Sequence, residues 1–416
     1  MRATGGRPKG LPPRRLFKAM SDSIRYSDRI CSAETTFGRI EPLLPEFGIT
    51  RLARLTGLDC IGIPVWNAVC PNSKSLVINQ GKGITDIDAK VSAAMEALER
   101  AVACAPHGPA RVASCRELLT EGDEALALPG LIASAQPDLG DDEPIRWILG
   151  RNLDGGAATW VPLEASLLDR TLENCRYWQS SDGLASGNTE TEAVLHGLLE
   201  RIERDAEVLS RLSPLPARLR GCVAPQSLGD PVLDAMARKI AAADLELRLF
   251  DITSDIGIPC FTAVLAGKDI LTAKAPLFHH VTVGHGAHPN APRAAIRAVT
   301  EAAQSRLTYI SGARDDVYPE TFVRPLPEQT RRLFEAVPRE TTPVSAFQAE
   351  GPDALLSFVL QRLREVGVGP VVSVPLLGNG LPFSVVKVFV PDLENPEGDR
   401  KRCFGTRALS WALAVA

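Results

Sequence analysis

An internal repeat constrains the fold of this chain more than any other feature of its sequence. Counted from Gly83 and from Gly187, the same residue types recur at the same offsets. The matched pairs are Thr85 and Thr189, Ala89 and Ala193, Ala93 and Gly197, Glu96 and Glu200, Glu99 and Glu203, and Arg100 and Arg204. Each copy begins at a glycine turn and continues into an alanine-rich segment, so we expect two similar turn–helix units.

A third copy is weaker but keeps the same register. Counted from His288, Glu301 takes the place of the first glutamate and Gln304 replaces the second. The segments 61–69 and 256–264, which precede the first and third copies, also resemble each other and have the composition of strands. Strands that alternate with helices indicate a layered α/β or α+β fold with internal pseudo-symmetry. We expect one integrated unit rather than separate domains.

The paired glutamates carry the chemical signal of the repeat. Residues i and i+3 share a helix face, so Glu96 and Glu99 form one pair of carboxylates, and Glu200 and Glu203 form a second. Two such pairs repel each other unless cations lie between them, and carboxylates on rigid helices suit Mg²⁺ bound together with phosphate. The alternative is a solvated helix face with ordinary charges. A duplicated fold has no need to keep four carboxylates, which favours the metal–phosphate interpretation.

Other candidate motifs are less specific. Lys82 lies between two glycines, but the residues around it lack the phosphate-binding pattern G-x₄-G-K-[ST]. Lys82 is therefore either a surface lysine or a lysine near phosphate. His285 and His288 flank a glycine, yet no third ligand is in view, so we interpret them as structural histidines. Asn188 is a candidate helix N-cap as well as a candidate site residue.

Composition restricts the class of protein. Of the 416 residues, 45% are hydrophobic and 23% charged, with a net charge of −4, which indicates a soluble globular protein without global attraction to nucleic acid. No apolar run reaches the roughly 18 residues of a membrane helix. The nine cysteines form no CxxC pair, and the basic N-terminus lacks the apolar core of a secretory signal. We expect a cytoplasmic protein with a basic, disordered tail over residues 1–24, or a tail that contacts a leader peptide or partner.

Three segments resemble the motifs of a known family. Residues 81–100 are similar to the first motif of the YcaO family, residues 183–206 to the second, and residues 293–316 to the third. The resemblance implies an α+β YcaO-type fold, with layered sheets, alanine-rich helices and an internal pseudo-repeat. It also implies that residues 25–416 are the catalytic domain, that ATP and several Mg²⁺ ions bind, and that the protein is a homodimer.

The resemblance also implies which residues form the site. Glu96, Glu99, Glu200 and Glu203 match the catalytic metal and phosphate ligands. Ser92, Asn188, Glu192, Arg204 and an arginine of the third motif, Arg293 or Arg297, match the rest of the nucleotide pocket, to which we add Lys82. Arg29 and Thr36 stand where the family has a lysine and a serine.

The family's chemistry is phosphorylation of a backbone amide oxygen after a nucleophile has attacked that amide. Residues 300–306 and 311–316 are most similar to members that work beside a TfuA protein, and residues 407–416 differ from the proline-rich end of many azoline-forming members. We therefore expect an ATP- and Mg²⁺-dependent enzyme that forms a thioamide with a TfuA-like partner, or an azoline, in a ribosomal peptide or protein. The alternatives are a different ATP-dependent ligase or kinase, a structural repeat protein, and a non-catalytic scaffold that binds a precursor peptide or a partner enzyme.

Overall fold

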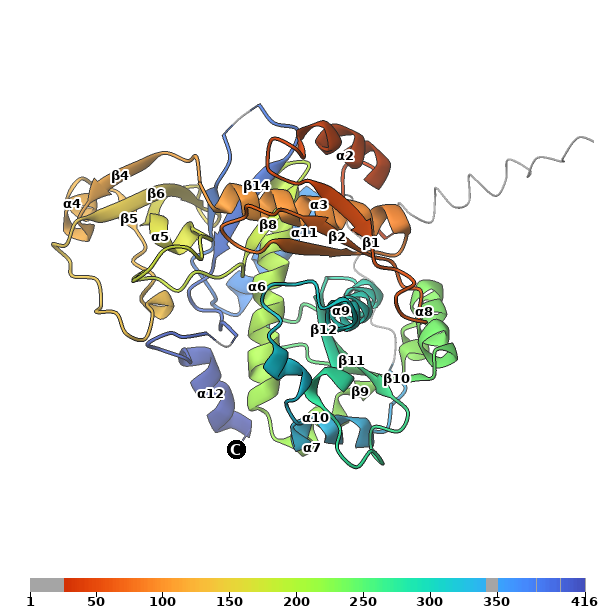
Figure 1. Ribbon diagram of the computed structural model, residues 1–416. Coiled ribbons are helices and arrows are strands. Elements are labelled where there is room, and N and C mark those ends of the chain that lie inside the picture. The colour runs from red at the N-terminus through yellow and green to blue at the C-terminus, as the bar shows by residue number, and fades with distance from the viewer. Residues whose placement is uncertain (1–25, 342–350, 379, 397, 416) are drawn as a thin grey trace, which may run out of the picture.

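The computed structural model describes residues 26–341, 351–378, 380–396 and 398–415. The tail predicted over residues 1–24 lies outside these ranges. Helices are combined with three separate β-sheets, as Figure 1 shows, so the predicted α+β class is confirmed. Among the described helices, none has both the length and the apolar composition needed to cross a membrane.

The first copy of the repeat forms an antiparallel sheet with a helix packed on it. Its elements are β1 (Arg51–Arg54), β2 (Val65–Val69), β3 (Ile78–Lys82) and α3 (Asp86–Ala103). β2 is the central strand, and α3 packs on β2 and β3. Thr85 caps α3 by accepting a hydrogen bond from the backbone N–H of Asp88, whose carboxylate accepts one from the backbone N–H of Thr85. The helix therefore begins where the repeated threonine predicts.

The third copy repeats this arrangement. Its elements are β9 (Cys222–Val223), β10 (Leu245–Asp251), β11 (Cys260–Gly267), β12 (Thr282–Ala287) and α9 (Ala291–Ser311). The strands are antiparallel in the order β12-β11-β10-β9, and α9 packs on β11 and β12. The similar segments 61–69 and 256–264 contain β2 and the first part of β11, so both strand predictions are correct.

The second copy uses a distant strand. Its helix α6 (Glu190–Leu212) follows β8 (Leu184–Gly187) and packs on β8 and on β14 (Ser384–Phe389). These strands belong to a mixed sheet, which also contains β4 (Ala110–Ala113), β5 (Glu124–Ala125), β6 (Ile145–Asn152), β7 (Ala158–Pro162) and β13 (Val372–Pro375). The unit thus takes its second strand from near the C-terminal end of the chain, which the repeat alone does not predict.

Shorter helices surround these three units. They are α2 (Ala33–Ile40), α4 (Cys115–Thr120), α5 (Leu163–Ser166), α7 (Leu215–Arg220), α8 (Pro231–Ala242), α10 (Glu328–Arg331), α11 (Pro352–Glu365) and α12 (Thr406–Val415). α12 lies beside the lower part of α6 in Figure 1, where Arg407 makes an ion pair of 2.9 Å with the buried carboxylate of Asp205.

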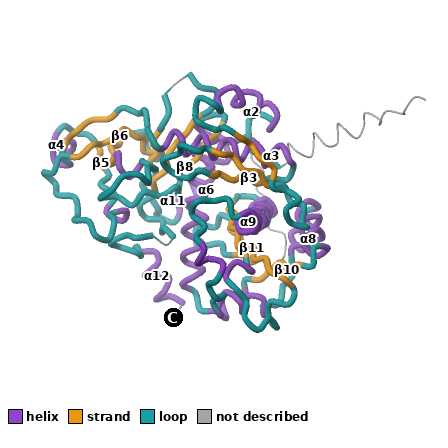
Figure 2. The backbone as a smooth tube through the Cα atoms, viewed as in Figure 1, coloured by secondary structure: helices purple, strands orange, loops and turns teal. Residues whose placement is uncertain are grey.

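The three units form a ring. Each long helix contacts its own sheet. It also contacts the strand that directly precedes the long helix of another unit: α3 contacts β8, α6 contacts β12, and α9 contacts β3. In Figure 2 these helices and strands lie close together near the centre of the molecule. Because the contacts close a cycle, the glutamates at equivalent positions on α3, α6 and α9 are directed to one region.

Close packing between strand and helix explains the small residues of the repeat. A Cβ atom added to Gly81 on β3 would lie 2.0 Å from the backbone nitrogen of Ala93 on α3. A Cβ atom added to Gly286 on β12 would lie 2.2 Å from the backbone oxygen of Ala294 and 2.6 Å from the backbone nitrogen of Ala298 on α9. The two contacts are equivalent, so glycine on the strand and alanine on the helix are both required for the backbones to approach this closely.

Candidate nucleotide and metal site

Helix α6 contributes more of the predicted site residues than any other element. Glu192 lies eight residues before Glu200, and Glu203 and Arg204 lie three and four residues after Glu200, so all of them are near one face of the helix. Thr189 caps α6 by accepting a hydrogen bond of 3.3 Å from the backbone N–H of Glu192. The N-cap is therefore Thr189 and not Asn188, which leaves the Asn188 side chain available to other partners.

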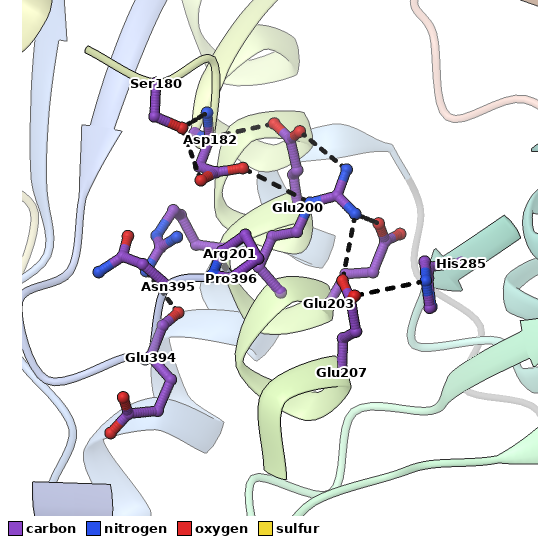
Figure 3. A network of polar contacts seen from close by, with 12 residues as sticks. Ser180, Asp182, Glu200, Arg201, Glu203, Glu207, His285, Glu394, Asn395 and Pro396 are labelled. Carbon is purple, nitrogen blue, oxygen red and sulfur yellow. Dashed lines mark hydrogen bonds and ion pairs between the residues drawn. The ribbon is translucent and has the colours of Figure 1, made fainter. Parts of the chain in front are cut away.

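Arg204 is the cation at the centre of a cluster of carboxylates. Its guanidinium lies 3.6 Å from Glu200 and 3.6 Å from Glu203, and further carboxylates belong to Asp182 and Glu207, both at 3.5 Å. Figure 3 shows these carboxylates converging on one side of α6. Burial, with Asp182 and Glu203 nearby, raises the pKa of Glu200 to about 7, and burial also raises the pKa of Glu203. One arginine therefore does not neutralise the cluster.

Helix α3 adds its own pair of carboxylates to this cluster. Glu96 makes an ion pair of 3.2 Å with Arg100, whereas Glu99 has no ion-pair partner among the described residues. Burial and the charges of Glu96 and Glu200 raise the pKa of Glu99 well above its usual range. Since Glu200 on α6 acts on Glu99 on α3, the two predicted pairs lie close to each other, as the repeat predicts.

The third helix contributes a carboxylate that is already paired. Lys82 of β3 donates a hydrogen bond to Glu301 of α9. Although burial acts to raise it, Lys82, Arg204 and His285 hold the pKa of Glu301 at about 2. Gln304, which replaces the second glutamate, donates a hydrogen bond of 2.9 Å to the backbone oxygen of Gln80. The third unit thus uses its variant position to join α9 to β3.

A small cavity whose lining contains several arginines lies next to the carboxylates. It has a volume of about 110 Å³, and its lining includes Arg29, Arg293, Arg297 and Glu192 from the predicted set. Glu192 is 3% exposed and accepts hydrogen bonds from the Arg29 guanidinium at 3.2 Å and from the Ile30 backbone N–H at 2.5 Å. The lining holds three arginines and two acids, Asp28 and Glu192, so an excess of positive charge remains for an anion.

The segment of residues 26–31, which precedes α2, covers one side of this cavity. Asp28 accepts two hydrogen bonds of 2.6 Å from Arg293, and Thr36 donates one of 2.9 Å to the side chain of Asn188. Asn188 in turn donates to Glu192 at 3.0 Å. Arg29 and Thr36, the two weakest matches to the family pattern, are therefore connected to the other predicted residues.

The burial of His288 predicts a loss of stability in acid. His288 is 1% exposed, and burial lowers its pKa from 6.5 to about 4. Between these values the unfolded chain binds a proton that the folded protein excludes, so the free energy of unfolding falls as the pH decreases, by up to about 3 kcal/mol. Denaturant titrations from pH 6.5 to about 4 measure this slope, and His288→Gln should remove that part of it. Parallel curves for the two proteins would contradict the prediction.

Nearly all predicted residues come together. Two sites in contact hold them: the carboxylate cluster, with Glu96, Glu99, Glu200, Glu203 and Arg204, and the cavity region, with Arg29, Thr36, Lys82, Asn188, Glu192, Arg293 and Arg297. Lys82 belongs between them, because its charge acts on Glu203 and on His196. Ser92 is partly buried on α3 and makes no hydrogen bond to another predicted residue in the part of the chain that is described. The roles of these residues as ligands stay predictions.

Several titratable residues of the site were not among those predicted from the sequence. They are Asp182, His196, Glu301 and Lys387. Glu301 had a visible signal, because it stands at the position of the first glutamate in the third copy. Lys387 had another, because it interrupts the apolar strand β14 and is 4% exposed. Burial lowers its pKa to about 8 beside Asp182 and Glu200.

The donor set fits Mg²⁺ that is held jointly with phosphate. Within the described ranges, no group of three or more His, Cys, Asp or Glu side chains is arranged to hold a metal ion. Mg²⁺ usually takes only one or two carboxylates and completes its shell with water and substrate phosphates. Unneutralised carboxylates beside an arginine-lined cavity provide both kinds of ligand.

Comparison with known proteins identifies the family. The sequence pattern of the family described as YcaO cyclodehydratase, ATP- and Mg²⁺-binding, matches residues 80–394. An uncharacterized protein in the tfuA 3′ region of Rhizobium leguminosarum bv. trifolii is 39% identical over 398 residues, which are 92% of this chain and 93% of the relative. An uncharacterized protein of Methanothermobacter thermautotrophicus is 34% identical over 365 residues, which are 84% of this chain and 91% of the relative.

Solved structures share the fold. A heterocyclase in complex with substrate and cofactor has a TM-score of 0.74 at 21% identity, over 92% of this chain and 55% of that chain. YcaO from Methanopyrus kandleri bound with AMPPCP and Mg²⁺ has a TM-score of 0.63 at 23% identity, over 88% of this chain and 92% of that chain. The predicted YcaO-type fold is confirmed, and the predicted cofactors, ATP and Mg²⁺, are those in the family's description. The chain belongs to the YcaO family of ATP- and Mg²⁺-binding, cyclodehydratase-type proteins.

Proposed function

We propose that this protein uses ATP and Mg²⁺ to phosphorylate a backbone amide oxygen of a ribosomal peptide or protein, and that it forms a thioamide together with a TfuA-like partner. The observation that carries the proposal is a cluster of negatively charged side chains that lies against a cavity with an excess of positive charge. Carboxylates of α3 and α6 that their neighbours do not neutralise lie beside a cavity lined by three arginines. A divalent cation and a polyphosphate are the pair of ligands that such a surface accommodates.

The residues divide between the two ligands by charge. Arg29, Arg293 and Arg297 bind phosphate oxygens, and Lys82 extends this positive surface toward the carboxylates. The metal ligands are Glu96, Glu99, Glu200 and Glu203. Arg204 holds Glu200 and Glu203 in position through contacts of 3.6 Å. Bound Mg²⁺ supplies neutralisation of the charge on the transferring phosphoryl group.

The chemistry requires no nucleophile from the protein itself. An amide oxygen is a poor leaving group, and its phosphorylation converts it into a good one. The attacking group comes from the substrate or from an external sulfur source. The protein's task is therefore to position the amide oxygen and the phosphate and to exclude water. Residues 26–31, which are hydrogen-bonded to Glu192 and Arg293 over the cavity, are placed to exclude water.

The thioamide product is supported by the relative encoded in the 3′ region of tfuA, which is similar over nearly the whole of both chains. External sulfide as the nucleophile yields a thioamide, whereas a neighbouring Cys, Ser or Thr of the substrate yields an azoline. We propose that the chain acts as a homodimer, as the family resemblance implies.

Removal of the metal tests the nucleotide site. We expect calorimetry to detect binding of ATP in the presence of Mg²⁺ and to lose it when EDTA is added, because the carboxylate cluster repels an uncompensated polyphosphate. The protein should remain folded in EDTA, since no described group of side chains holds a metal by itself. Wild-type protein that is folded but does not bind ATP with Mg²⁺, also in the presence of the partner, would exclude the enzyme and favour the scaffold.

The product is determined separately. Candidate precursor peptides are incubated with the protein, MgATP, sulfide and a TfuA-like protein, and analysed by mass spectrometry. Exchange of one oxygen for sulfur with release of phosphate is the expected result. Loss of water instead would assign azoline formation, and ATP hydrolysis without any change in peptide or protein would argue for a different kinase or ligase.

A further inference from the structure

His196 is a buried polar group of the site that the chemistry above does not use. It lies four residues after Glu192 and four before Glu200, so it occupies the same face of α6 between the cavity and the carboxylates. Its side chain lines the cavity together with Arg29, Arg293 and Arg297. Its position is therefore at the junction of the two ligand sites.

The Nδ1 atom of His196 is buried and has no hydrogen-bond partner among the described residues. Two other histidines of this region are satisfied: Nε2 of His288 lies 2.9 Å from Asp28, and Nδ1 of His285 lies 3.1 Å from Thr262. Buried polar atoms are nearly always paired, so a histidine left unpaired beside a cavity indicates a missing ligand.

The charges around His196 define that ligand. The groups that face it from neighbouring elements are Lys82 of β3, Arg29 of the segment before α2, and Arg293 and Arg297 of α9. The acids of the cavity, Asp28 and Glu192, are already hydrogen-bonded to Arg293 and Arg29, respectively. Burial and the charges of Arg297, Arg29 and Lys82 lower the pKa of His196 well below 6.5. The imidazole of His196 is therefore neutral in the free protein. It becomes a cation, and so attracts an anion, only when a negatively charged ligand offsets the surrounding arginines and lysine.

We propose that His196 takes up one proton from solvent when the nucleotide polyphosphate enters this cavity, and that the imidazolium donates a hydrogen bond to a phosphate oxygen. One N–H bond forms on the ring and one proton is lost by the buffer, so the complex gains a single positive charge. The negative phosphates reverse the local field that keeps the free imidazole neutral. This inference rests on the proposed nucleotide site and adds a cation that exists only in the complex.

The sign of the pH dependence follows from this change. Protonation is disfavoured in the free protein and favoured in the complex, so affinity for MgATP should decrease as the pH rises through the value at which the bound imidazolium loses its proton. For one proton the decrease approaches, at most, about tenfold per pH unit. Proton release from Glu99, Glu200 and Glu203 on Mg²⁺ binding acts in the opposite direction, so the slope due to His196 is the difference between the wild type and His196→Gln.

Calorimetry in buffers of different ionisation enthalpy measures the proton directly. At neutral pH we expect the wild type to take up as much as one proton more per bound MgATP than His196→Gln, since the protons that Mg²⁺ displaces from Glu99, Glu200 and Glu203 are released by both proteins. His280→Gln is the matched control, because His280 is exposed and outside the cavity lining, and it should retain wild-type uptake.

The outcomes separate the two proposals. Binding of MgATP with the same number of protons exchanged by the wild type and by His196→Gln would overturn the role of His196 and leave the nucleotide site intact. Absence of MgATP binding by the wild type would overturn the nucleotide site and this inference with it. His196→Asn is a second variant for the same comparison, so a poorly folding His196→Gln protein would leave the test decisive.

Discussion

Glu200→Gln is expected to lower kcat for MgATP turnover with a peptide substrate by about 10²–10³-fold. Glutamine keeps the size of the side chain and one oxygen but removes the charge at the centre of the cluster. Glu200 lies 3.6 Å from Arg204 and acts on Glu99 of the neighbouring helix, so its loss weakens both carboxylate pairs. Steady-state release of phosphate at saturating MgATP and peptide measures the effect.

The stability of the same variant should move in the opposite direction. The pKa of Glu200 rises from 4.5 to about 7 on folding, so the free energy of unfolding falls as the pH increases from 4.5 to about 7, and the loss is complete above that pH. In metal-free protein, Glu200→Gln should therefore be more stable than wild type above this pH, by up to about 3 kcal/mol, and similar to it in acid. A residue that served only the fold would show the reverse.

Glu190→Gln is the control for both measurements. Glu190 begins the same helix, is exposed, and faces Arg151 at 3.7 Å outside the cluster. It should change neither kcat nor stability appreciably. Glu200→Gln protein with kcat within a few-fold of the control would contradict the proposed role of the cluster.

The turn–helix units could be predicted because the repeated residues make contacts within their own unit. Thr85 and Thr189 cap their helices, and the glycines and alanines mark close contact between strand and helix. These constraints act between residues near in sequence, so they leave a regular spacing. The pairing of β8 with β14 leaves none, because β14 follows β8 by about 200 residues. The repeat therefore could not predict the mixed sheet.

The site was predictable where its residues recur and unpredictable where they occur once. Glu96, Glu99, Glu200 and Glu203 repeat at equal offsets, so their common face was visible in the sequence. Lys387 enters the site from a strand of otherwise apolar residues. Its partner is the backbone oxygen of Ser180, a contact that depends on how two distant segments meet. Single residues of this kind could not be predicted, because only the packing of the three units against one another brings them to the site.

Gly81→Ala is expected to destabilise the protein by more than about 3 kcal/mol, because the added methyl group would overlap the backbone of α3. The nearest atom, the backbone nitrogen of Ala93, would lie only 2.0 Å away, and a backbone moves less easily than a side chain. Gly286→Ala meets the backbone oxygen of Ala294 on α9 at 2.2 Å and should have a similar effect. Thermal and denaturant unfolding measure both.

Gly38→Ala is the matched control for this pair, and it should differ from them in sign. Gly38 is an exposed residue of helix α2, and a Cβ atom there would have no other atom within 4 Å. Alanine should therefore stabilise α2 by about 0.5–1 kcal/mol. Because all three variants add the same methyl group, opposite effects would demonstrate that the repeated glycines allow strand and helix to touch. Equal effects would mean that the glycines serve only their turns, and the close packing that orients α3 and α9 toward the site would lose its support.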